Sequence, residues 1–137
     1  MNSPDTEVDA IPLVETGPGS PAHDLFSAAR DPQTDEMYQT IWKDFHAELI
    51  PRLQSLGTIN NSVHLKEELH AVRGMSAQFG LFLLELYLCA WEVRSIDPQV
   101  EKERYLPGAL VIARRSLTAI EEAFPYLKGD YSRASTV

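Results

Sequence analysis

The stretch that decides the fold is residues 62–80, SVHLKEELHAVRGMSAQFG. Its apolar and small residues recur at alternating intervals of four and three, which is the spacing of one face of an α-helix. These residues are Leu65, Leu69, Val72, Ser76 and Phe79. Gly80 follows directly, and glycine is the residue type that most often ends a helix. The stretch therefore predicts an amphipathic helix with one face in a core.

Three further blocks show the same helical spacing, and no run of strict alternation indicates a strand. Residues 35–56 contain Pro51, which should bend the helix, and are followed by Gly57. Residues 81–96 are apolar nearly all round and are predicted to form the most buried helix. Residues 100–127 return to intervals of four and three. The sequence predicts an all-α fold, a four-helix up-and-down antiparallel bundle.

The chain ahead of these blocks differs in composition. Five of the nine prolines lie in the first 32 residues, and residues 1–36 hold eight of the 20 acidic residues and one of the 12 basic residues. Proline at this density disfavours long helices. Residues 1–33 are therefore predicted to be a flexible acidic segment, with a short extra helix over residues 22–30 as an option. The helical domain is expected to span residues 34–128, and a C-terminal tail residues 129–137.

Length and composition exclude several classes of function. A chain of 137 residues forms one domain. Its body, without the acidic segment, is nearly neutral and has no basic stripe, so no nucleic-acid partner is expected. Cys89 is the single cysteine, and the N-terminus has no pattern of a secretory signal, which favours a cytoplasmic protein. The apolar run at residues 81–90 is interrupted by Glu85 and too short for a membrane span. A closed bundle favours a monomer.

His70 is the residue of the 62–80 helix that points to chemistry. At 100° per residue its side chain lies roughly 140° from the centre of the apolar face, so it should point outward. Gly74 follows one turn later, where glycine costs a helix about 1 kcal/mol relative to alanine, which suggests close approach by another molecule. Arg73 and Gln78 lie on the same side and could reach an anion held on the imidazole.

This segment resembles the signature of histidine-containing phosphotransfer (HPt) domains, H-x-L-K-G-S-S-x-x-x-G. It keeps the histidine, the apolar residue at plus two, a base at plus three, and Gly74, Ser76 and Gly80. The residues that follow are similar to the family's next helix at Leu84, Leu88-Cys89 and Trp91-Glu92. The resemblance covers about residues 35–127. The chain departs from the signature at Val72 for Leu, Arg73 for Lys, Met75 for Ser and Trp91 for Leu.

The resemblance implies a role in a two-component phosphorelay. His70 would accept a phosphoryl group from the aspartyl phosphate of a receiver domain and pass it to another receiver, with Arg73, Gly74 and Gln78 as supporting site residues. The expected partners are response-regulator receiver domains and, upstream, a hybrid sensor histidine kinase. No cofactor is expected on this chain, because the receiver supplies Mg²⁺ in this family. No glycine-rich phosphate loop indicates ATP binding.

Other interpretations stay open beside this one. An HPt-like helical module could dock a receiver domain without phosphotransfer, and in that case His70 would have no chemical role. The dimerising hairpin of a histidine kinase is disfavoured, because no ATP-binding domain follows. Glu67-x-x-His70 matches half of a di-metal site, but the sequence has no second copy. Glu67 is instead expected to face solvent or to hydrogen-bond the His70 ring, and Cys89 is expected to pack in the core.

Overall fold

The computed structural model describes residues 12–27, 31–94 and 98–128, and every regular element in these ranges is a helix. The predicted all-helical body is therefore confirmed. The elements are the α-helices α2 (Pro21–Phe26), α3 (Pro32–Ser55), α4 (Ser62–Gln78), α5 (Phe82–Arg94) and α6 (Pro98–Ala123), and the 3-10 helices η1 (Leu56–Thr58) and η2 (Pro125–Lys128).

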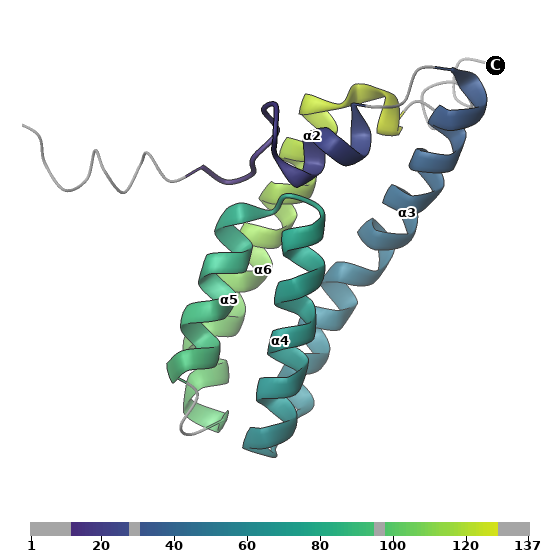
Figure 1. Ribbon diagram of the computed structural model, residues 1–137. Coiled ribbons are helices and arrows are strands. Elements are labelled where there is room, and N and C mark those ends of the chain that lie inside the picture. Colours follow the sequence, from purple (N-terminus) through teal and green to yellow (C-terminus); the bar gives the residue numbers. More distant parts are fainter. Residues whose placement is uncertain (1–11, 28–30, 95–97, 129–137) are drawn as a thin grey trace, which may run out of the picture.

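The four long helices α3 to α6 lie side by side, and each runs in the opposite direction to the one before it (Figure 1). α4 packs mainly on α5, while α6 packs on both α3 and α5. Pro51 and Pro107 lie inside α3 and α6 without ending them. The long helices of the described residues therefore follow the predicted order along the chain.

Polar side chains fix where two of these helices begin. The Asp31 carboxylate accepts a hydrogen bond from the Thr34 backbone N–H at 2.9 Å, and this contact lowers the pKa of Asp31 below its ordinary value of 3.8. The Asn61 side chain accepts from the His64 backbone N–H at 2.9 Å. Both side chains satisfy a donor that the first turn of a helix leaves unpaired, so they act as N-caps of α3 and α4.

The core contains the apolar face predicted for the 62–80 stretch. All five residues of that face are buried, and so are Trp42 of α3 and Trp91 of α5. Burying a large apolar side chain stabilises a fold by about 1.5–3 kcal/mol, so these stripes hold the helices together. The opposite face of α4 therefore points away from the core.

Among the four long helices, the described part of the stretch predicted to be most buried, residues 81–94, does have the smallest share of exposed residues, but one face of α5 still points outward. In α5 only Leu84, Leu88 and Trp91 are buried, while the side chain of Leu86 is 44% exposed and that of Val93 is 75% exposed. The reason is the place of α5, which packs on α4 and α6 and so turns one face outward. An apolar composition all round says nothing about which face that is. Residues 95–97 of the predicted helix lie outside the described residues.

Residues 12–27, here called the N-terminal cap, belong structurally to the helical body. The sequence predicted a flexible segment up to residue 33, but within the cap Ala22 and Phe26 are fully buried. The ring of Phe26 lies 5.7 Å from that of Trp42, in an edge-to-face contact. This burial offsets the entropy lost when the segment is ordered. The helix expected at residues 22–30 lies at Pro21–Phe26, and residues 28–30 are outside the described ranges.

The cap is held to the turn between α4 and α5 by backbone hydrogen bonds. The Glu15 N–H donates to the carbonyl of Gly80 at 3.0 Å, and the Leu83 N–H donates to the carbonyl of Leu13 at 3.2 Å. Gly80 has a φ of +81°, and a Cβ there would lie 2.7 Å from the Cβ of Ala22. Both the left-handed backbone and the close approach of the cap therefore require glycine.

A buried lysine, Lys102, lies at the end of the helical body opposite the N-terminal cap. The side chain of Lys102 is 5% exposed, and its ammonium group donates to the carbonyl oxygens of Gly57 at 3.1 Å and Ile59 at 2.8 Å and to the Asn60 side chain at 3.3 Å. Three acceptors match the three donors of a lysine. The contact ties α6 to the connection between α3 and α4, and the sequence pattern did not predict it.

Candidate functional site

α4 carries His70 on its outward face. Leu69 and Val72 on either side are fully buried, and the helical geometry turns the His70 side chain, which is 66% exposed, away from the core. The orientation therefore agrees with the roughly 140° expected from the spacing. Its imidazole is open to another molecule, while the backbone that carries it is fixed by core packing.

Arg73 lies against this imidazole. Its Nη2 donates a hydrogen bond to His70 Nδ1 at 2.9 Å, and its Nη1 donates to the Sγ of Cys89 on α5 at 3.2 Å. The Arg73 side chain is 26% exposed, so a fixed cation borders the ring. Cys89 was expected to pack in the core, but its side chain is half-buried between the helices and contacts this arginine.

Glu92 of α5 is the carboxylate of the site. Its Oε2 lies 3.6 Å from His70 Nδ1, and its Oε1 lies 3.6 Å from Arg73 Nη1. Oε1 is buried and accepts no hydrogen bond in the described part of the chain. The sequence singled out Glu67 for this role, but Glu67 is exposed and lies on α4 itself. The spacing within one helix could not show that the next helix supplies the acid.

Gly74 leaves open surface beside the ring. A Cβ added there would meet no atom within 4 Å, so nothing inside the described molecule requires glycine at this position. Gln78 is exposed but lies about 12 Å along the axis from His70, and no hydrogen bond joins it to the site in the ranges the structure describes. The structure thus brings His70, Arg73 and Glu92 together, leaves Gly74 open beside them, and leaves Gln78 apart.

A second charged group flanks α4 on the side of α3. Arg52 Nε donates to Glu68 at 2.8 Å, and this hydrogen bond raises the pKa of Arg52. Arg52 Nη1 also contacts the sulfur of Met75 at 3.6 Å, and Met75 packs partly against the core. Met75, where the HPt signature has serine, therefore fills space between α3 and α4 rather than lying beside His70.

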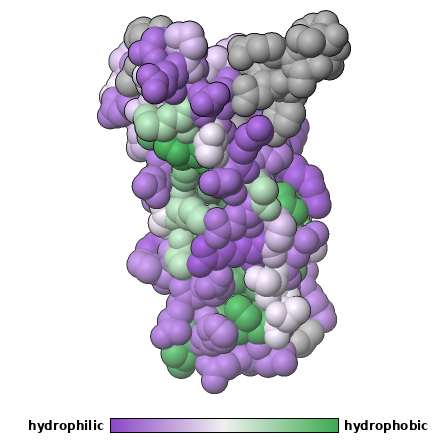
Figure 2. All heavy atoms as spheres, turned by 90° about the vertical axis from the view of Figure 1, so that its right-hand side faces the viewer, coloured by the Kyte–Doolittle hydropathy of each residue, from purple (hydrophilic) through white to green (hydrophobic). Residues whose placement is uncertain are grey.

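The outer face of α5 adds apolar surface next to the site. It consists of Phe82, Leu86, Ala90 and Val93, at the intervals of one helix face, with Phe82 half-buried and the other three exposed. Cys89 and Glu92 on the same helix contact Arg73, which places this face along the edge of the site. By contrast, the side of the molecule shown in Figure 2 is mostly hydrophilic with separate hydrophobic patches.

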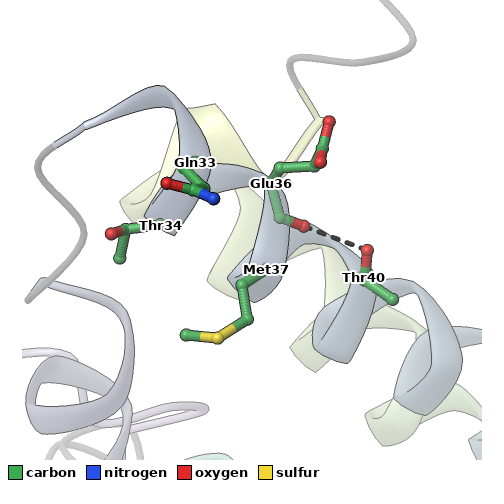
Figure 3. A pocket seen from close by; sticks show the side chains of 5 residues that line it. All are labelled: Gln33, Thr34, Glu36, Met37 and Thr40. Carbon is green, nitrogen blue, oxygen red and sulfur yellow. Dashed lines mark hydrogen bonds between the residues drawn. The ribbon is translucent and has the colours of Figure 1, made fainter.

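One hollow in the described surface is remote from this site. It measures about 460 Å³ and is lined by Gln33, Thr34, Glu36, Met37 and Thr40 at the start of α3 (Figure 3). The dashed line in the figure marks a hydrogen bond of 3.0 Å that the Thr40 hydroxyl donates to the carbonyl oxygen of Glu36. Arg52, the α3 residue that contacts α4, lies about 24 Å further along the axis of α3 than this hollow. The hollow has no cluster of reactive groups.

The residues that the structure describes contain no group of three or more His, Cys, Asp or Glu side chains placed to hold a metal ion. No described helix combines the length and the apolar character that a membrane crossing needs. Comparison with known proteins found no matching family model, no matching curated protein and no matching solved structure. The site is therefore interpreted from its own geometry.

Proposed function

We propose that this chain is a histidine-containing phosphotransfer protein of a multistep phosphorelay in the cytoplasm. In this proposal α3 to α6 are an up-and-down four-helix bundle of the HPt kind, and His70 carries the phosphoryl group between receiver domains. The proposal is supported by the resemblance of residues 70–80 to the HPt signature together with the geometry around His70.

The observation that carries the proposal is a solvent-exposed imidazole with a cation fixed against it. The side chain of His70 is 66% exposed, and Arg73 is 2.9 Å from its Nδ1. A histidine in the core of a helical protein would be buried and paired instead. Neutral imidazole is a good nucleophile near neutral pH, and a neighbouring cation stabilises the negative charge of an incoming phosphoryl group.

The transfer step needs little machinery on this chain. The lone pair of Nε2 attacks the phosphorus of the receiver's aspartyl phosphate, the bond from phosphorus to the carboxyl oxygen breaks, and that oxygen leaves as part of a carboxylate. His70 is then a phosphorylated imidazolium that keeps its proton on Nδ1. In this family the receiver supplies Mg²⁺, so the present chain contributes the nucleophile, its orientation and the charge of Arg73.

Docking would use the open surface around the ring. The missing side chain at Gly74 allows the receiver to approach the imidazole, and the outer face of α5 offers apolar contact at its edge. A transient signalling contact of this kind needs only a modest buried area. We expect a monomer to bind one receiver at a time, since the same face would serve donor and acceptor.

The test is transfer from a receiver that has been phosphorylated with acetyl phosphate and Mg²⁺. Intact-mass analysis at neutral pH should show one added phosphoryl group on the native chain, labile to acid, and none on His70→Gln. The His64→Gln variant is a matched control, because His64 is also exposed on α4. Phosphorylation that persists in His70→Gln would contradict the proposal.

A second candidate is an HPt-like module that docks a receiver without accepting phosphate. The exposed apolar face of α5 favours it, since such a face would serve docking with or without chemistry. The two candidates differ in one result. A panel of receivers that binds the chain with measurable affinity, yet never phosphorylates it, would favour the docking module.

A further inference from the structure

Two arginines lie side by side on the outer face of α6. Arg114 and Arg115 are both exposed, and Val111, one turn earlier on the same face, is 52% exposed. Residues 111, 114, 115 and 118 follow each other at the three- and four-residue intervals of one helix face and are here called the α6 stripe. Neither arginine forms a hydrogen bond or an ion pair within the described residues. Because a guanidinium stays charged in proteins, the stripe carries two positive charges that no described residue pairs.

The α6 stripe borders the point at which the described chain begins. A hollow of about 360 Å³ lies beside the arginines, and its lining residues are Leu13, Arg114, Arg115, Thr118, Ala119 and Glu122. The carbonyl of Leu13 accepts a hydrogen bond from the Leu83 N–H at 3.2 Å, which fixes residue 13 against the start of α5. The chain that precedes Leu13 is therefore attached at the edge of the stripe.

The chain ahead of this point has the opposite charge. Residues 5–9, DTEVD, contain Asp5, Glu7 and Asp9 and no basic residue. An extended chain spans about 3.3 Å per residue, so at most about 13 Å separates Asp9 from Leu13 and at most about 26 Å separates Asp5 from it. The two arginines line the same hollow as Leu13. All three carboxylates therefore have enough chain to reach the arginines.

We propose that residues 5–9 bind to the α6 stripe of the same chain, with their carboxylates paired to Arg114 and Arg115. Exposed ion pairs are individually weak. A short tether raises the effective concentration of the acids at the arginines to the order of millimolar, which favours this occupant over a separate acidic molecule. The inference depends on charge and reach alone and does not rest on the proposed function.

The α6 stripe lies on the far side of the bundle from His70. α4 packs mainly on α5, whereas α6 packs on α3 and α5, so the outer faces of α4 and α6 point in opposite directions. Arg73 beside His70 is 26% exposed and is a second cation that acidic residues would be attracted to. Under the proposed function, carboxylates there would compete with the phosphoryl group. Binding at the stripe keeps them away from it.

The first measurement compares backbone amide shifts of the full chain, labelled with nitrogen-15, with and without the three acids. Asp5→Asn/Glu7→Gln/Asp9→Asn should shift the amide signals of residues 111–118 and leave those of residues 66–77 around His70 unchanged. In about 1 M salt, where the Debye length is about 3 Å, the native shifts should move toward those of the variant. Identical shifts at residues 111–118 in the two chains would overturn the inference.

The second measurement locates the segment directly. A nitroxide spin label on Thr6→Cys, in a Cys89→Ala background, speeds the relaxation of amide protons that come close to it. The label should weaken the amide signals of residues 111–118. Arg114→Gln/Arg115→Gln should restore these signals. Arg94→Gln is the matched control, because Arg94 is an exposed arginine on α5, and it should leave the weakening in place.

Other occupants of the stripe and other places for the segment give different signals. Weakening around Arg73 instead of at residues 111–118, or no selective weakening, would overturn the inference. Weakening at residues 111–118 of a nitrogen-15 chain without a label, mixed with spin-labelled chain, would assign the stripe to a second copy and would also overturn it. A failure of phosphoryl transfer would refute the proposed function without changing any of these signals, which separates the two failures.

Discussion

Two regions of this molecule are held together in different ways. At the N-terminal cap, Phe26 is fully buried and its ring meets those of Tyr38, Trp42, Phe79 and Phe124. At the site on α4, His70 is exposed and its contacts are a hydrogen bond and an ion pair. Burial makes the first region important for stability, whereas partly solvated polar contacts contribute little. The second region is free to serve chemistry, because the fold does not depend on it.

The largest expected effect is on the capped end. Phe26→Ala should lower the free energy of unfolding by about 4 kcal/mol, because it empties a fully buried site among aromatic rings. Urea denaturation followed by circular dichroism measures this loss. The matched change on the other region, His70→Gln, should alter stability by less than about 0.5 kcal/mol. Similar losses in the two variants would remove the contrast between the regions.

The next effect concerns the glycine under the cap. Gly80→Ala should cost about 2 kcal/mol, because the residue has a φ of +81° and the new Cβ would lie 2.7 Å from Ala22. Proteolysis of the folded chain within residues 12–27 should also become faster, since the cap would loosen. An unchanged urea midpoint would show that the turn can accommodate a side chain, and that the cap is not seated on it.

At Gly74, unlike at Gly80, replacing glycine with alanine should stabilise the fold. Gly74→Ala should raise the free energy of unfolding by about 1 kcal/mol, because the position is inside a helix and its Cβ would meet no atom within 4 Å. Gly74→Gln should also fold, but should slow phosphoryl transfer by blocking the receiver. Transfer at the native rate by a folded Gly74→Gln chain would contradict the role assigned to this open surface.

These contrasts show which parts could be predicted from sequence. The intervals between Leu69, Val72 and their neighbours determine which face of α4 is buried, so the outward direction of His70 followed from local geometry alone. The position of Glu92 beside His70 did not follow from the sequence. α5 is apolar nearly all round, so its pattern does not fix its rotation, and only packing shows that Glu92 faces α4 while Leu86 and Val93 face outward.

The sequence predicted a short helix over residues 22–30 within the N-terminal segment, and α2 lies at Pro21–Phe26, but the sequence did not predict how deeply this helix is buried. The prolines and acidic residues of residues 1–33 indicate a flexible segment, and a single aromatic residue such as Phe26 has no periodic pattern to reveal its place. Its burial depends on rings from α3 and from the residues that follow α4 and α6. The signature did predict Gly80, but not its physical reason, which is the contact with Ala22 in the cap.

The smallest expected effect is a pH dependence at the start of α3. The pKa of Asp31 is lowered by hydrogen bonds from the backbone and side chain of Thr34. A carboxylate whose pKa is lower in the folded state stabilises the fold above its unfolded pKa, and this contribution is lost as the pH falls through the folded value. Asp31→Ala should therefore be less stable than the native chain at neutral pH, and the difference in the free energy of unfolding should shrink below about pH 4.

Urea midpoints of both chains at neutral and acidic pH measure this difference. A difference that stays constant between them would show that the hydrogen bonds do not depend on the charge. The His70 site lies on α4, away from this carboxylate, so the transfer rate should not change with Asp31→Ala.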